Sequence, residues 1–157
     1  MEHKILTARC VDLFEKFFSP PVHAYMLCAD KFAGKADIAL YVAKRLLCSS
    51  AIAPCGACPS CTMLSTSKEH PCLTIISRAN GKSSIPVEDI RAIRNGIFDA
   101  PYLSKYKIFI IEEAERMTQS AQNALRIVLH KYLYIKKYVK QEILTITNII
   151  SPFLLLD

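Results

Sequence analysis

Four cysteines lie close together in one stretch of the chain and restrict how that stretch can fold. In order they are Cys48, Cys55, Cys58 and Cys61. The last three follow the spacing C-x2-C-x2-C in the run C-G-A-C-P-S-C, and six residues separate this run from the first cysteine. A structural Zn²⁺ ion takes four soft ligands in a tetrahedron, and a C-x2-C turn supplies two thiolates from one tight loop. Gly56 and Pro59 suit such turns. The spacing therefore predicts a zinc module over residues 48–62.

Two other interpretations of these cysteines stay open. A bacterial iron–sulfur run requires a fourth cysteine three residues further on, followed by proline. Ser65 stands at that position, so the match fails. Buried free thiols are the other alternative, because cysteine often behaves as a small apolar residue. His70 and Cys72 are possible substitute ligands, although a local packing role suits each of them better.

Composition narrows the class of protein. The chain has 157 residues, which suits one compact domain with a small inserted module, and 52% of them are hydrophobic, enough for a real core. A net charge of +6 favours an acidic partner such as nucleic acid. Seven cysteines without an export signal indicate a reducing compartment. No apolar run approaches the roughly 18 residues that span a bilayer. We therefore expect a cytoplasmic protein without a membrane partner.

Helical and strand patterns alternate along the chain. Apolar spacing predicts helices over residues 4–18, 35–47, 87–98 and 118–129. Short β-prone runs predict strands over residues 23–28, 73–76, 106–111 and 142–147. Alternating strands and helices imply an α/β fold with a parallel sheet between helices.

The segment before the second predicted helix has the frame of a phosphate-binding loop. A working loop reads G-x4-G-K-[ST]: its glycines admit the phosphates, its lysine reaches them and its hydroxyl binds Mg²⁺. Gly34 and Lys35 keep the end of this pattern, but Ala29 replaces the first glycine and Ala36 the hydroxyl. Asp30 adds negative charge where phosphate would lie. The pattern predicts a degenerate nucleotide site in which ATP binding is doubtful.

Acidic residues follow the strand predicted over residues 106–111. Glu112 and Glu113 stand where a parallel strand ends, the place where a Walker B pair holds Mg²⁺. The extra methylene of Glu112, compared with aspartate, disturbs the octahedral geometry that Mg²⁺ requires. A solvated acidic helix start is the alternative. Together with Gly34 and Lys35, these glutamates favour a decayed nucleotide site.

These motifs together resemble the N-terminal AAA+ module of bacterial DNA polymerase III clamp-loader subunits. The resemblance covers residues 5–129 well and 130–157 poorly. The segments that carry it are His23–Leu27, Leu46–Cys48 with C-G-A-C-P-S-C and His70-Pro71, Ile90–Ile93, Tyr106–Ile111, Ala114–Met117, and Ala121–Arg126 with its A-x-N-A-L pattern. The resemblance implies an AAA+ domain I over residues 1–157 into which the zinc module is inserted.

Within this family, the damaged phosphate loop resembles the delta-prime subunit, the stator, and differs from the gamma/tau motors. The resemblance therefore implies no catalytic residues in this chain. The chain would act with gamma/tau and delta subunits to load the sliding clamp on primed DNA. The family's S-R-C arginine-finger motif is absent, so the resemblance implies a domain truncated before that motif.

Two other functions remain as alternatives. A gamma/tau-like clamp-loader ATPase would need a tolerant phosphate loop, which the alanines at positions 29 and 36 disfavour. A zinc-dependent nucleic-acid-binding module would place basic residues around the cysteines, yet residues 49–67 contain none. The Lys/Tyr-rich segment 131–140 could stack on nucleic acid, although a solvated surface explains it better.

Overall fold

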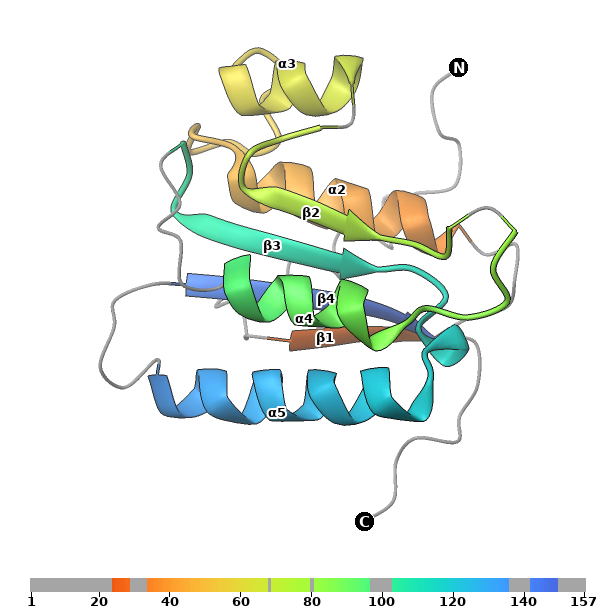
Figure 1. The fold of residues 1–157 in the computed structure, drawn as a ribbon. Helices are drawn as coiled ribbons and strands as arrows, with labels where there is room; N and C mark the ends of the chain where they lie inside the picture. The colour runs from red at the N-terminus through yellow and green to blue at the C-terminus, as the bar shows by residue number, and fades with distance from the viewer. Residues whose placement is uncertain are drawn as a thin grey trace.

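The computed structural model describes residues 24–28, 34–67, 69–79, 81–96, 103–135 and 142–149, of which 131–135 and 142–149 are described by their backbone. Within these residues the strands form one parallel sheet in the order β1-β4-β3-β2 (Figure 1). The strands are β1 (Ala24–Cys28), β2 (Leu73–Ile76), β3 (Tyr106–Ile111) and β4 (Glu142–Ile149). This confirms the predicted α/β class and the parallel sheet.

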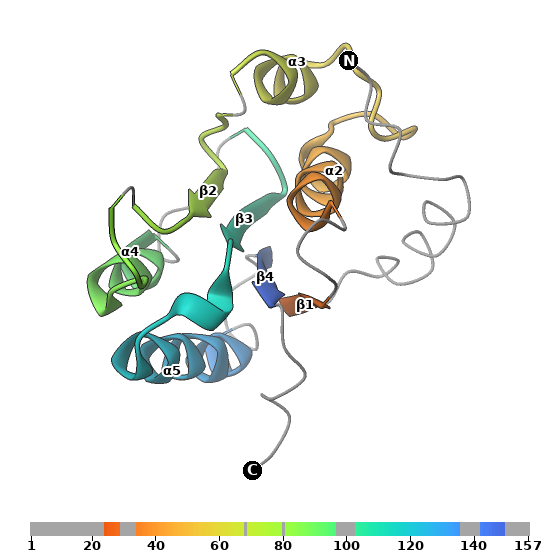
Figure 2. The same cartoon turned by 90° about the vertical axis from the view of Figure 1, so that its right-hand side faces the viewer.

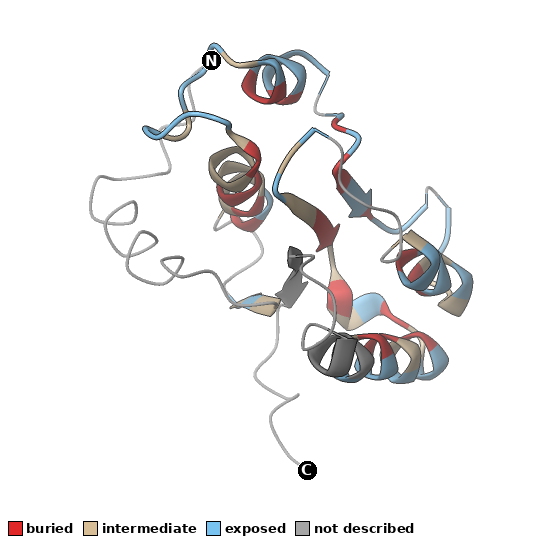
Figure 3. Ribbon diagram, turned by 90° about the vertical axis from the view of Figure 1, so that its left-hand side faces the viewer, coloured by how far each residue is buried: buried red, intermediate tan, exposed pale blue. Residues whose placement is uncertain are grey.

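Helices cover both faces of the sheet (Figure 2). Helix α2 (Lys35–Leu47) packs on one face, and α4 (Val87–Gly96) and α5 (Gln119–Ile135) lie side by side on the other. Helix α3 (Pro59–Thr66) packs against α2 beside the edge strand β2, and the short 3-10 helix η1 (Ala114–Arg116) links β3 to α5. The buried side of each helix faces the sheet or a neighbouring helix (Figure 3). The arrangement is a three-layer sandwich.

Strand β3 separates two hydrophobic cores. Ile108 and Ile110 point toward α2 and join a core with Val42, Leu47 and neighbours. Phe109 and Ile111 point the other way, into a core with α4 and α5. All four are at most 2% exposed. Successive side chains of a strand point to opposite faces, so a run of four apolar residues fills both cores at once.

Most predicted elements occur where the sequence patterns place them. The strands over 73–76 and 106–111 and the helix over 35–47 have the predicted bounds. The helix predicted to end near residue 129 instead continues to Ile135, so the first part of the Lys/Tyr-rich segment is helical. Helix α3 was not predicted. The helix expected over residues 4–18 lies outside the described residues.

Among the described parts of the chain, no helix is both long enough and apolar enough to cross a bilayer.

Candidate functional site

The four clustered cysteines are positioned by the ends of two helices. Helix α2 ends at Leu47, and Cys48 follows in an extended conformation. Cys58 is the N-cap of α3, and Pro59 occupies the first helical turn, a position that proline favours because no N–H is needed there. Between them Gly56 has a φ of 72°, which lets the chain turn sharply. Both ends of the loop are therefore anchored on regular structure.

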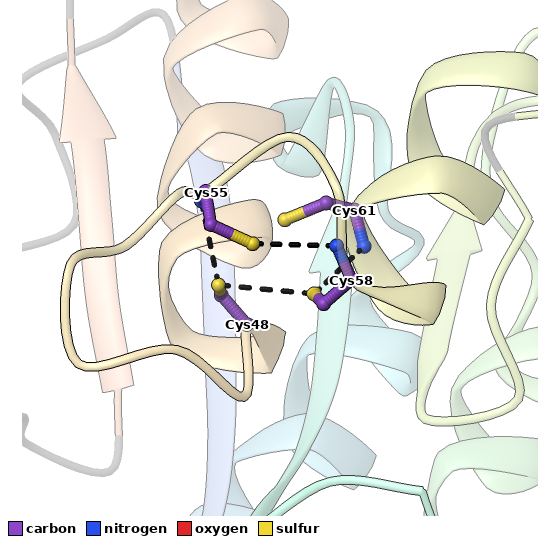
Figure 4. Close-up of side chains that lie close together, drawn as sticks. All are labelled: Cys48, Cys55, Cys58 and Cys61. Carbon is purple, nitrogen blue, oxygen red and sulfur yellow. Dashed lines mark hydrogen bonds between the residues drawn. The ribbon is translucent and has the colours of Figure 1, made fainter.

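The four sulfur atoms converge on one point (Figure 4). The Sγ atoms of Cys48, Cys55, Cys58 and Cys61 all lie within 4.8 Å of one another, and those of Cys48 and Cys58 are 3.8 Å apart. A tetrahedral Zn²⁺ ion with Zn–S bonds of about 2.3 Å would set its sulfurs about 3.8 Å from one another. The cluster is thus close to the size that a tetrathiolate metal site requires, and the four cysteines could bind one metal ion.

Backbone N–H groups surround the sulfurs and favour the thiolate form. The N–H groups of Ser50 and Cys55 point to Cys48 Sγ at 3.4 and 3.5 Å, and that of Cys58 points to Cys55 Sγ at 3.3 Å. Hydrogen bonds from the backbone of Ser49 and Cys61 lower the pKa of Cys58 to about 6. Since a thiolate is the form that binds metal, these donors prepare the loop for a cation.

Cys61 behaves in the opposite way. It is 1% exposed, and burial raises its pKa far above the usual range of a thiol. Without a cation nearby this thiol keeps its proton. A metal ion supplies the charge that lets a buried sulfur ionise, so metal binding at this cluster would release a proton.

His70 and Cys72 are not part of the cluster. The Nδ1 atom of His70 accepts a hydrogen bond from the Cys72 backbone N–H at 3.0 Å, and its Nε2 lies 3.0 Å from the Ser60 hydroxyl. Both ring nitrogens are therefore used, and burial lowers the pKa of the imidazole. The residue ties α3 to the start of β2, which is the local role expected for it. Sequence reasoning gave no signal for its partner Ser60.

Side chains of α2 fasten the cysteine loop from the other side. Arg45 Nη1 donates a hydrogen bond to the carbonyl oxygen of Ala53 at 2.8 Å. Lys44 Nζ donates to Ser65 Oγ of α3 at 3.3 Å. The last turn of α2 thus contacts both the loop between the first two cysteines and the helix that carries the last one.

The predicted nucleotide-site residues lie at the opposite edge of the sheet. Gly34 adopts a left-handed conformation with a φ of 69°, and its carbonyl oxygen accepts the first hydrogen bond of α2, from Ile38 N–H at 3.0 Å. Lys35 begins the helix and is only 6% exposed. A helix N-terminus with a lysine is a suitable place for an anion. Positions 29–33 of the loop, which include Ala29 and Asp30, lie outside the described residues, whereas Ala36 lies in the first turn of α2.

Glu112 and Glu113 follow β3 at this same edge but do not act as a free pair. Glu112 N–H extends the ladder by donating to Ile76 O at 2.8 Å. Glu113 takes a left-handed conformation with a φ of 48°, and its carboxylate forms an ion pair with Arg78 at 3.0 Å. Arg78 also donates to Lys82 O at 3.0 Å. The second acid is therefore paired with an arginine, a partner that sequence reasoning missed.

The two candidate sites are connected by one helix. Gly34 and Lys35 stand at the start of α2 and Cys48 directly after its end, so the thirteen residues of the helix separate them by about 20 Å. The cysteine loop lies at the end of the sheet where the parallel strands begin. The segment with the two glutamates lies at the other end, where the strands finish (Figure 1).

Comparisons with known proteins agree on the kind of protein this is. A family model described as DNA polymerase III, delta subunit, matches residues 19–130. The gamma/tau subunit of DNA polymerase III from Mycobacterium tuberculosis is 33% identical over 105 residues, 66% of this chain and 18% of that protein. The delta' subunit from Pseudomonas aeruginosa is 30% identical over 105 residues, 66% of this chain and 32% of that protein. The chain thus spans less than a third of these relatives.

A solved structure supports the fold. It is a gamma subunit-related protein of DNA polymerase III from Thermotoga maritima, with a TM-score of 0.51 and 15% sequence identity. The match covers 89% of this chain and 39% of the chain from Thermotoga maritima. At this identity the likeness concerns the fold alone, a mixed α/β domain with a parallel sheet of the kind AAA+ domains have. Since the family model covers most of the chain, the chain belongs to the DNA polymerase III delta-subunit family, among the clamp-loader subunits of that polymerase.

Proposed function

We propose that this chain is the AAA+ domain I of a delta-prime-like stator, a subunit that helps load the sliding clamp without hydrolysing ATP itself. The observation that carries this proposal is the Arg78–Glu113 ion pair, because it occupies the acid that a motor subunit would need for Mg²⁺ and water. Ala36 lacks the hydroxyl that would complete the metal shell. Lys35 remains for weak anion binding only.

A gamma/tau-like ATPase is the second candidate. Its support is the 33% identity to a gamma/tau subunit together with the retained Gly34 and Lys35. Hydrolysis by such a subunit requires Mg²⁺ held by a hydroxyl and an acid. Ala36 supplies no hydroxyl and Glu113 is paired with Arg78, so the stator is the better supported function.

The metal at the cysteine cluster is proposed to be zinc. Four thiolates in a tetrahedron of this size suit Zn²⁺, which has no preferred geometry of its own and favours soft ligands in closed structural sites. The ligands are Cys48, Cys55, Cys58 and Cys61, and residues 48–62 form the inserted module. When bound, the ion would cross-link the end of α2 to the start of α3 and has no open position for catalysis.

The proposed partners are gamma/tau and delta subunits, with the sliding clamp and primed DNA reached through the complex. The names of the relatives place them in DNA polymerase III, which supports a role in assembly. A charge of +6 adds only a nonspecific, salt-sensitive attraction to DNA. Contacts between protein subunits should persist at salt concentrations that abolish this attraction to DNA.

Metal binding is the first test. The purified chain should contain one Zn²⁺ per chain, measured by elemental analysis. Losing a residue that only hydrogen-bonds to a metal ligand typically weakens metal binding roughly 10–100-fold. Cys58→Ser should weaken zinc binding by more than this, because it removes a ligand itself. Cys28→Ser, which changes an exposed thiol outside the cluster, is the matched control and should keep the metal. Zinc absent from the unaltered chain, with four freely titrating thiols, would refute the assignment.

Hydrolysis is the second test. The isolated chain should show no steady-state ATPase activity above that of its Lys35→Ala variant, because Ala36 supplies no hydroxyl for Mg²⁺ and Glu113 is paired with Arg78. Breaking the ion pair with Arg78→Ala should not create activity, since Ala36 still lacks a Mg²⁺ ligand. An ATPase rate that Lys35→Ala abolishes would favour the gamma/tau-like candidate.

Assembly is the third test. Purified gamma/tau and delta subunits should bind the chain in a surface-bound assay, and binding should persist between about 50 and 200 mM salt, a change that weakens phosphate contacts steeply. Duplex DNA serves as the comparison ligand and should dissociate over this interval. Binding to DNA alone, lost as salt rises, would support the nucleic-acid module instead of the stator.

A further inference from the structure

Strand β2 ends the described sheet and leaves one of its sides open. In a parallel ladder, the N–H and C=O groups of alternate residues point to opposite neighbours. Ile108 N–H donates to Cys72 O and Glu112 N–H donates to Ile76 O, both at 2.8 Å, so the even-numbered residues face β3. The backbone groups of Leu73 and Ile75 therefore point away from the sheet.

The chain itself closes only the beginning of this edge. Leu73 N–H donates to His70 O at 2.9 Å, in a short antiparallel bridge. For Ile75 no backbone partner on the outer side occurs among the described residues. Its N–H and C=O form a donor and acceptor pair that an additional strand could engage, and His70 fixes where such a strand would have to begin.

A groove runs along the open edge. Its volume is 630 Å³, and it is lined by Met63, Ser67, Glu69, His70, Pro71, Leu73 and Ile75. Met63 on α3 is 37% exposed and Ile75 on β2 is 40% exposed, both high for large apolar side chains. The lining therefore comes from α3, from the loop that follows it and from β2. The side chains of Leu73 and Ile75 lie on the same face of β2 because they alternate with Thr74.

We propose that this edge binds an extended segment of a partner protein, which adds to the sheet as a further strand beside Ile75. The segment would exchange backbone hydrogen bonds with Ile75 and place aliphatic side chains at alternate positions against Met63 and Leu73. Glu69 is the acidic residue that lines the groove, and it is exposed, so the segment should carry a lysine or arginine at that end. The inference does not depend on the stator function.

A selection from displayed random twelve-residue peptides tests this proposal. Peptides enriched on the immobilised chain should share alternating aliphatic residues and one basic residue, and their affinity is then measured by fluorescence anisotropy. Ile75→Pro removes the outward N–H but no bond to β3, and should weaken binding about tenfold or more. Ile75→Val keeps the N–H and an apolar side chain, and should bind within about threefold of the unaltered chain.

Glu69→Lys tests the charge, and should weaken binding several-fold unless the basic residue of the peptide is changed to glutamate. If Ile75→Pro does not fold, Met63→Arg on the exposed side of α3 blocks the groove without touching the sheet. Failure to enrich any peptide, or enriched peptides that bind equally well to the Ile75 and Met63 variants, would overturn the proposal. Self-association of the chain in sedimentation experiments, if Ile75→Pro abolishes that self-association, would also overturn the proposal. The edge of β2 would then bind a second copy of the chain.

Discussion

The burial of β3 on both faces is the constraint on which the rest of the structure depends. Ile108 and Ile110 fill one core and Phe109 and Ile111 fill the other, so the same six-residue strand holds α2 on one side and α4 with α5 on the other. A run of four consecutive buried apolar residues suits the interior of a parallel sheet with helices on both faces. Each fully buried side chain contributes roughly 1.5–3 kcal/mol before the entropy cost of ordering the chain, so losing any one of them matters for a domain whose net stability is only about 5–15 kcal/mol.

The position of β3 also explains where the functional residues lie. Its carboxyl end delivers Glu112 and Glu113 to the edge where α2 begins with Lys35, while the cysteines gather at the far end of α2. The cysteine cluster and the degenerate nucleotide site are thus separated by the length of a helix. At the nucleotide edge an arginine pairs with the second acid; at the other, backbone N–H groups and Arg45 prepare a loop for a metal ion. These contrasts are the basis of the proposed stator function and of the proposed metal site.

Sequence reasoning succeeded where a local pattern determines structure. Short β-prone runs predicted the strands of the sheet, and apolar residues at helical spacing predicted the helices that cover it. The cysteine spacing predicted the cluster whose sulfur atoms the fold brings together. It missed α3, because eight residues with two serines and two threonines show weak helical periodicity, and the helix is instead started by its N-cap Cys58 and Pro59. It also missed Arg78 as the partner of Glu113, since thirty-five positions separate them and no local signal joins strands that pair through the fold.

The central claim is that the sheet is stable through β3 while the metal orders only the cysteine module. Hydrogen exchange measured by mass spectrometry on the zinc-loaded and chelator-stripped chain tests this most directly. The account predicts faster exchange in residues 48–62 after zinc removal and unchanged protection in β3, because the cores on either side of β3 contain no residue of this module. Loss of protection across β3 together with the module would contradict it, and would show that the metal, and not the buried strand, holds the fold together.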